Sequence, residues 1–214
     1  MRWLSLIVLF SASFSFAQKI NGVSIEIGDA PLKDTSLNDV QSLKANWIAA
    51  IPFGYLKKGE TDIRWNTLNQ AWGERPSSIA ELIKQANTKG IKVMLKPQLW
   101  IHDQFVGHID FGDTIAKWTN LESNYERFIL SFAKMADTLN VDLLSIGCEF
   151  KTWVKKRPQY WSALIDKIRL VYKGSLTYSA NWDNFYNVKF WNKLDYVGID
   201  SYFPLSDAQT PTVS

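Results

Sequence analysis

The protein has 214 residues, of which 46% are hydrophobic and 21% are charged, and its formal net charge at pH 7 is +3. This length and composition predict one globular domain with a single hydrophobic core. The chain has no basic patch, no arginine run and no zinc-ligand spacing, which argues against a nucleic-acid-binding protein.

Residues 1–17 have the pattern of a secretory signal peptide. Arg2 supplies the positive charge, Trp3–Phe10 form the apolar region, and Ser15-Phe16-Ala17 fits a cleavage site. A single anchoring helix is the alternative, but the apolar stretch is shorter than the roughly 20 residues of a membrane span. We therefore expect a secreted or periplasmic domain of residues 18–214, without a membrane contact after cleavage.

The first half of this domain predicts strands that alternate with helices. The expected elements are, in chain order, a strand at 20–28, a helix at 36–45, a buried strand running into a loop at 46–56, a polar loop at 57–76, a helix from Ser78 and a strand at 91–97. Ser78 and Glu81 have the spacing of a capping box for that helix. Gly90 is suited to the position that ends it.

The second half continues the alternation. The expected elements are an aromatic-rich loop at 98–118, a helix from Thr119, a strand at 142–148, a helix from Pro158 to Gly174, a strand at 175–180, a helix or turn near 188–193 and a strand at 195–200. Thr119 and Glu122 offer a second capping box. Pro158 is suited to the first position of a helix.

The order βαβαβαβαβαβ predicts an α/β fold with a parallel sheet and right-handed crossovers. A doubly wound sheet of six strands is one option, but it usually carries a glycine-rich phosphate loop after its first strand, and GDAPLKD (28–34) is not one. The long loops after the second and third strands suit a groove across the top of a barrel. We therefore favour a TIM-type (β/α)8 barrel of which about six β/α units are present.

Three apolar segments end in polar residues. They are VDLLSIGCEF (141–150), LTYSANWD (176–183) and LDYVGIDSYFPL (194–205). In a parallel barrel the strand body packs inside and the strand end carries the reactive side chain. Glu149 is therefore the leading candidate for a catalytic group. We interpret the one cysteine, Cys148, as a packing residue and not as a nucleophile.

The chain is rich in aromatic residues, with ten tryptophans. Those expected in loops are Trp65, Trp72, Trp100, Trp118, Trp153 and Trp182. Indole rings stack on sugar rings, and they also fill protein cores. The group is consistent with a carbohydrate groove or with packing.

Both histidines, His102 and His108, fall in the loop predicted at 98–118, near Asp103 and Asp110. A metal site is one interpretation, although paired loop histidines are more often solvated. We expect no metal and no other cofactor.

Five motifs together resemble glycoside hydrolase family 113, a family of retaining β-mannanases and related proteins built on a (β/α)8 barrel. The motifs are KPQLW (96–100), IGCEF (146–150), RPQYWSALIDKIRLVYKG (157–174), LTYSANWDNF (176–185) and FWNKLDYVGIDSYFPL (190–205). The resemblance runs from about residue 20 to the end of the chain. It implies a glycosidase that cleaves β-mannan or a related β-linked polysaccharide or oligosaccharide.

The resemblance also implies roles for individual residues. Glu149 matches the acid/base, which protonates the glycosidic oxygen and later deprotonates the attacking water. The family's nucleophile is a glutamate at the end of the seventh strand, so we expect it beyond Ser214 and expect this piece alone to be inactive. Tyr202 falls where related barrels place a tyrosine that hydrogen-bonds the nucleophile. Strand-end positions that line the sugar groove match Lys96, Gln98, Trp100, Asn181, Trp182 and Asp183.

Several assignments have alternatives. Lys96 contacts substrate, or it pairs with Glu149 or with the nucleophile. Asp200 is a further candidate at the site, either catalytic or bonded to the barrel loops. Two features depart from relatives: Cys148 stands where most families of the same clan have asparagine, and IEIGDAPLKD (25–34) is unlike the usual opening. The alternative function is a non-catalytic carbohydrate-binding barrel or an inactive fragment.

Overall fold

The computed structural model describes residues 19–33, 35–206 and 208. The predicted signal peptide lies outside these residues. In the part of the chain that is described, no helix is long and apolar enough to cross a membrane.

The described chain alternates strands and helices. The strands are β1 (Gly22–Ile25), β2 (Trp47–Ala50), β3 (Phe53–Leu56), β4 (Lys92–Leu95), β5 (Gln98–Ile101), β6 (Leu143–Cys148), β7 (Ser175–Asn181) and β8 (Gly198–Asp200). The helices are α1 (Asn38–Ser42), α2 (Pro76–Thr88), α3 (Ile115–Thr138), α4 (Lys151–Lys156) and α5 (Pro158–Val171). Short 3₁₀ turns lie at 72–74, 106–108, 185–187 and 191–193.

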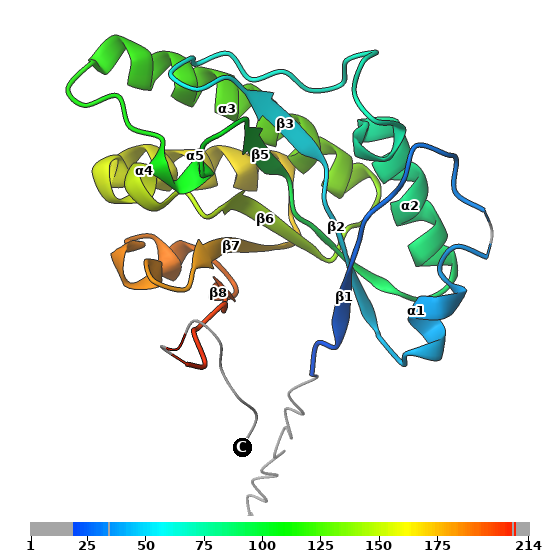
Figure 1. The fold of residues 1–214 in the computed structure, drawn as a ribbon. Coiled ribbons are helices and arrows are strands. Elements are labelled where there is room, and N and C mark those ends of the chain that lie inside the picture. Colours follow the sequence, from blue (N-terminus) through cyan, green and yellow to red (C-terminus); the bar gives the residue numbers. More distant parts are fainter. Residues whose placement is uncertain (1–18, 34, 207, 209–214) are drawn as a thin grey trace, which may run out of the picture.

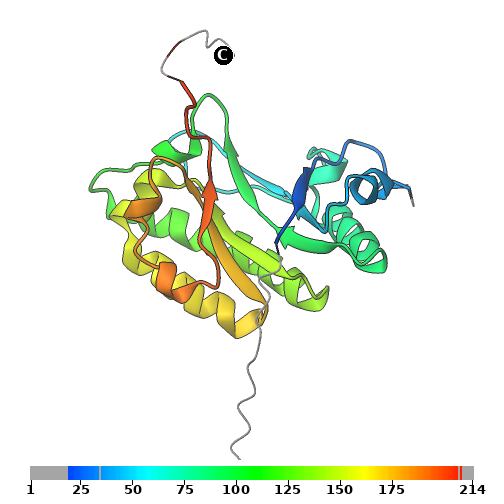
Figure 2. The ribbon, with the colours of Figure 1, turned by 90° about the horizontal axis from the view of Figure 1, so that it is seen from below.

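Six strands form one sheet in the order β1-β2-β4-β6-β7-β8, and every pairing in it is parallel. The predicted α/β class with a parallel sheet is therefore confirmed. The sheet curls, with the longer helices along its outer face (Figures 1 and 2). The result is a half-barrel whose two edge strands are β1 and β8.

Two strands continue beyond the sheet after a proline. β2 is followed by Ile51-Pro52 and then β3, and β4 is followed by Lys96-Pro97 and then β5. A proline has no N–H to donate, so it interrupts the ladder of the main sheet. β3 and β5 pair in parallel as a second, two-stranded sheet. The predicted strand within 46–56 is confirmed, but the loop into which it was expected to run is a second strand, β3, and the prediction of a loop throughout 98–118 was wrong.

Both predicted capping boxes were also wrong. α2 begins at Pro76, and the Ser78 hydroxyl donates to the Trp72 carbonyl instead of capping the helix. α3 begins at Ile115, four residues before Thr119, so that buried Trp118 belongs to its apolar face. In both cases burial of the apolar face of the helix outweighs the local cap, and in α2 a proline at the first position also favours the earlier start. The predicted start of α5 at Pro158 is confirmed. The predicted end of α2 at Gly90 is also confirmed, and Gly90 has a φ of +67°.

The core lies between the sheet and the helices of its outer face. β6 is buried along its whole length, and the apolar faces of α2, α3 and α5 pack around it and its neighbours. Trp118 and Trp153, which were expected in loops, are buried on α3 and on the unpredicted short helix α4. These two tryptophans therefore serve packing and not a groove.

Candidate active site

A β-bulge in β6 shapes the site. Ser145 pairs with Thr177 and Cys148 pairs with Ser179, so β6 has one more residue than β7 between the two pairs. Strict alternation would place Cys148 on the same face as Ile146, toward the helices. The extra residue instead brings Cys148 to the face of Ser145, which is the concave face.

Hydroxyl groups support this bulge from the concave side. The Ser145 hydroxyl donates to the Gly147 carbonyl at 2.9 Å, and it lies 3.0 Å from the hydroxyl of Ser179. All these groups are buried, so their hydrogen bonds replace contacts with water. The sequence offered no signal for either serine, because neither lies at a strand end.

Glu149 follows the bulge in a left-handed backbone conformation, with a φ of +56°. This conformation is unfavourable for a residue with a Cβ, by about 1–2 kcal/mol. Main-chain hydrogen bonds hold it: the Glu149 N–H donates to the Ser179 carbonyl at 2.8 Å, and the Lys151 N–H donates to the Glu149 carbonyl at 2.8 Å. The Phe150 N–H donates to the Tyr178 hydroxyl at 2.8 Å. The carboxyl group is therefore presented from a rigid turn at the end of β6.

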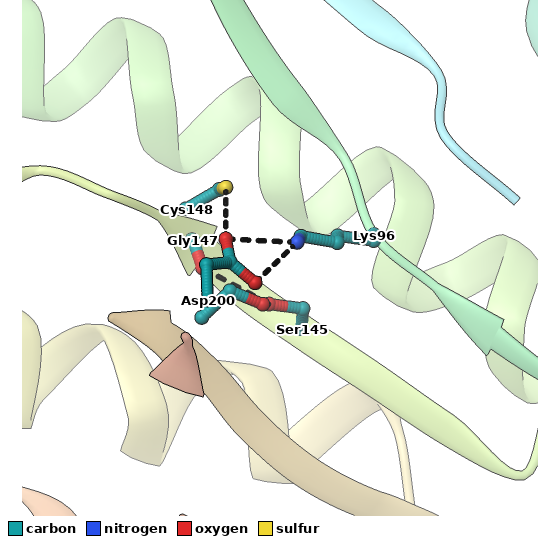
Figure 3. Close-up of polar contacts among 6 residues, drawn as sticks. Lys96, Ser145, Gly147, Cys148 and Asp200 are labelled. Atoms are coloured by element: carbon teal, nitrogen blue, oxygen red, sulfur yellow. Dashed lines mark hydrogen bonds and ion pairs between the residues drawn. The ribbon is translucent and has the colours of Figure 1, made fainter. Parts of the chain in front are cut away.

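An ion pair lies beside this turn (Figure 3). Lys96 Nζ donates to Asp200 Oδ1 at 2.8 Å and to Oδ2 at 3.0 Å. The Cys148 thiol lies 3.4 Å from Asp200 Oδ2. Lys96 therefore pairs with Asp200 and not with Glu149, which was one of its three alternatives, and Asp200 bonds to a strand end across the sheet. Cys148 is buried, as expected for a packing residue, and it also contacts Asp200.

The surroundings of Glu149 favour its protonated form. Burial raises the pKa of this half-buried carboxyl, and the negative charges of Asp200 and Asp183 raise it further, whereas Lys96 acts in the opposite direction. Burial also raises the pKa of the Cys148 thiol, which is therefore neutral at physiological pH. A carboxyl group whose pKa is raised in this way is suited to general acid catalysis.

Asn181 ends β7, and Trp182 and Asp183 follow it, so all three lie at the same end of the parallel sheet as Glu149. Asn181 Oδ1 accepts a hydrogen bond from the Asp183 N–H at 3.2 Å, which fixes the turn. Asp183 forms an ion pair with Lys151, a partner that the sequence did not indicate. The Trp182 ring packs edge-on against Phe203, with ring centroids 5.7 Å apart.

Gln98 and Trp100 lie on β5, in the second sheet. Gln98 lines a cavity of about 490 Å³ together with Phe53, Glu74 and residues 24–29. Trp100 is 47% exposed and lies edge-on to Tyr55 at 6.0 Å. Gln98 and Trp100 are two residues apart on β5, so their side chains share one face of this strand.

The remaining candidates are Tyr202 and the two histidines with their neighbouring aspartates. Tyr202 is 78% exposed, and its N–H donates to the Asp200 carbonyl at 3.0 Å. His102 pairs with Asp103 at 2.6 Å. Asp110 forms an ion pair with Lys156. In the described part of the chain, no group of three or more His, Cys, Asp or Glu side chains is placed to hold a metal.

Comparison with solved structures shows the fold. A GH113 β-1,4-mannanase, solved as a complex, matches with a TM-score of 0.74 and 24% identity over 87% of this chain and 63% of its own. The GH113 β-mannanase AaManA from Alicyclobacillus acidocaldarius, in complex with ManMIm, matches with a TM-score of 0.77 and 21% identity over 90% of this chain and 64% of its own. The prediction of a partial (β/α) barrel is thus confirmed, and the chain spans less than two thirds of these relatives.

A search of curated proteins found no match. The model of Glycoside Hydrolase Family 113 matches residues 29–213, which is most of the sequence. The match includes every motif that carried the resemblance. The chain belongs to glycoside hydrolase family 113.

Proposed function

We propose that this protein is a retaining glycoside hydrolase that cleaves β-mannan or a related β-linked polysaccharide, with Glu149 as its acid/base. The observation that carries the proposal is the half-buried carboxyl group of Glu149 on a rigid left-handed turn at the end of β6. Family membership and the similarity to solved GH113 mannanases support the substrate class.

In this proposal Glu149 acts in both steps of the reaction. As the acid, it donates its proton to the glycosidic oxygen while a second carboxylate attacks the anomeric carbon and forms a glycosyl-enzyme. As the base, the Glu149 carboxylate then accepts a proton from the water that releases the sugar. The family's nucleophile belongs to a seventh strand, and no described residue corresponds to it.

The predicted groove residues have different parts in this proposal. Trp100, Trp182 and Tyr202 present aromatic rings to sugar faces, since each is at least partly accessible. Gln98, Asn181 and Asp183 supply hydrogen-bonding groups for sugar hydroxyls. We also propose that residues 1–17 direct export to the periplasm or the medium, which N-terminal sequencing of the mature protein tests.

The acid/base role is tested with two substrates whose leaving groups differ. Assays use the protein together with any sequence that follows Ser214 in its gene, because the similar structures are longer than this chain. Glu149→Gln is expected to lower kcat/KM on mannooligosaccharides about 10²–10⁴-fold. On a dinitrophenyl β-mannobioside the loss of kcat/KM is expected to be under about tenfold, because that leaving group departs without a proton.

Glu60→Gln is the matched control, since Glu60 is an exposed glutamate on the loop after β3. Equal losses of kcat/KM on both substrates in Glu149→Gln would contradict the acid role of this residue. Mannan binding without hydrolysis, in the unaltered protein and in Glu149→Gln alike, would favour the non-catalytic carbohydrate-binding barrel.

A further inference from the structure

The Lys96–Asp200 ion pair joins strands that are not neighbours in the sheet. Lys96 follows β4 and Asp200 ends β8, and the order β4-β6-β7-β8 leaves two strands between them. Lys96 Nζ nevertheless contacts both carboxylate oxygens of Asp200, at 2.8 and 3.0 Å. The pair therefore crosses the concave face of the half-barrel, next to the end of β6 (Figure 3).

Strand register places both partners on that face. Met94, two residues before Lys96, pairs with Leu143, and Leu143 shares a face with Ser145. On the other side Asp200 pairs with Asn181, which shares a face with Ser179. Since the Ser145 and Ser179 hydroxyls meet at 3.0 Å, all these side chains point into the half-barrel.

Because the Lys96–Asp200 pair is largely buried, a gain in folding stability alone is a poor explanation for it. The side chains of Lys96 and Asp200 are only 14% and 20% exposed. Removing two such charges from water offsets most of their attraction, and well-packed apolar residues often stabilise a site as much. A role in the neighbouring site accounts better for the pair.

The neighbouring site is the Glu149 turn. The charged groups close enough to shift the pKa of its carboxyl are Asp200 from β8, Lys96 from the end of β4 and Asp183 from the end of β7. Asp183 is paired with Lys151 of α4. The Cys148 thiol and the Tyr178 hydroxyl also lie nearby, and both stay neutral at physiological pH because burial raises their pKa values.

We propose that the Lys96–Asp200 pair is a positioning element that sets the pH range over which the Glu149 carboxyl keeps its proton. The inference rests on the acid/base role proposed for Glu149. Asp200 disfavours ionisation of Glu149 and Lys96 favours it, so the intact pair holds these opposing influences in balance. When either partner is replaced, only the charge of the other partner still shifts the pKa of Glu149.

The test is a direct titration of Glu149 by NMR, which requires no enzymatic activity. The chain has seven glutamates, so selective carbon-13 labelling of glutamate carboxyl groups gives few signals, and Glu149→Gln identifies the relevant one. Asp200→Asn is expected to lower the pKa of Glu149 by about one pH unit, and Lys96→Met to raise it by about one. The double variant is expected to titrate near the unaltered protein.

Opposite shifts in the single variants, cancelled in the double variant, would support the proposal. A structural role alone would perturb Glu149 in the same direction in both single variants, or in neither, and either result would overturn it. Lys96→Gln repeats the Lys96→Met titration with a polar side chain, so the test does not depend on whether the Lys96→Met variant folds. Lys96→Arg, which keeps the charge, is expected to leave the titration near that of the unaltered protein.

A second readout uses the active enzyme. The alkaline limb of the pH–kcat profile reports the acid form of Glu149. It is expected to move to higher pH in Lys96→Met and to lower pH in Asp200→Asn. A fall in kcat with an unmoved limb would count against the proposal. Failure of Glu149→Gln to affect catalysis would instead overturn the proposed function and leave the NMR result standing.

Discussion

Trp161 of α5 stacks on Phe150, the residue that follows Glu149, with ring centroids 5.5 Å apart and planes 30° from parallel. Both side chains are fully buried. The same indole also packs against four other core rings, those of Tyr125, Trp153, Tyr178 and Phe190. The turn that presents the candidate acid is thus backed by an aromatic core from α3, α4, α5 and β7.

This relationship predicts that Trp161→Ala destabilises the chain by about 3–5 kcal/mol, because it leaves a cavity among rings that cannot close around it. Urea unfolding followed by circular dichroism measures the loss. Trp100→Ala is the control: its indole is 47% exposed, and the expected change is within about 0.5 kcal/mol. Equal losses in the two variants would contradict the assignment of Trp161 to the core.

Gly198 allows β8 to approach β7. A Cβ at this position would lie 2.6 Å from the Tyr178 carbonyl oxygen, which is main chain and cannot move independently. Gly198→Ala is therefore expected to displace β8 and to destabilise the chain by about 1–3 kcal/mol. Gly28→Ala is the matched control, since its Cβ would meet no atom within 4 Å.

The displacement of β8 has its own readout. Asp200 ends β8, so in Gly198→Ala the Lys96 ammonium is expected to lose its partner, and the NMR titration of Glu149 to shift as in Asp200→Asn. Unfolding free energies of Gly198→Ala and Gly28→Ala that agree within error would show that the β7–β8 contact is not tight.

Glu149 is expected to reduce stability at neutral pH. Its pKa is raised in the folded chain, first by burial and then by Asp200, so ionisation opposes folding. The contribution is absent below the unfolded-state pKa of about 4.3, and stability falls as the pH rises from there through the folded value. Glu149→Gln should therefore stabilise the chain at pH 8 but not at pH 4, in urea titrations at both values.

Glu60→Gln is the control for this pH dependence, because Glu60 is exposed. It is expected to follow the unaltered chain at both pH values. A Glu149→Gln variant that is no more stable than the unaltered chain at pH 8 would contradict the environment described for the carboxyl group.

The aromatic side chains near the strand ends are expected to affect substrate affinity more than turnover. Under the proposed function, Trp182→Ala should raise KM for mannooligosaccharides about tenfold, which corresponds to the loss of about 1.4 kcal/mol of stacking. Tyr196→Ala is the control: Tyr196 is 45% exposed but precedes β8, at the opposite end of the sheet. A change in kcat with an unchanged KM would argue against a stacking role.

Much of the architecture was predictable because it follows from local patterns. Gly90 adopts the left-handed conformation after α2, and Pro158 begins α5, as their residue types require. The strand that ends at Cys148 was recognised from an apolar run that meets a charged residue. The capping boxes at Ser78 and Thr119 failed because helix starts depend on which apolar residues are buried, and that is not a local property.

The sequence predicted which residues belong to the site better than it predicted how they are arranged. Lys96, Glu149 and Asp200 were all identified from strand ends, but the pairing of Lys96 with Asp200 depends on the curvature of the whole sheet. The bulge at Ile146-Gly147 and the left-handed turn at Glu149 have no signature in the sequence, since both come from register with β7.

The sequence by itself determined the alternation of strands and helices, the class of fold, the family and the identity of the candidate acid. These depend on residue type and spacing along the chain, which folding does not change. Only the tertiary structure decided which charges lie beside Glu149, which tryptophans are buried and where β6 bulges. Those properties arise when strands distant in the sequence curl toward one another and exclude water from the space between them.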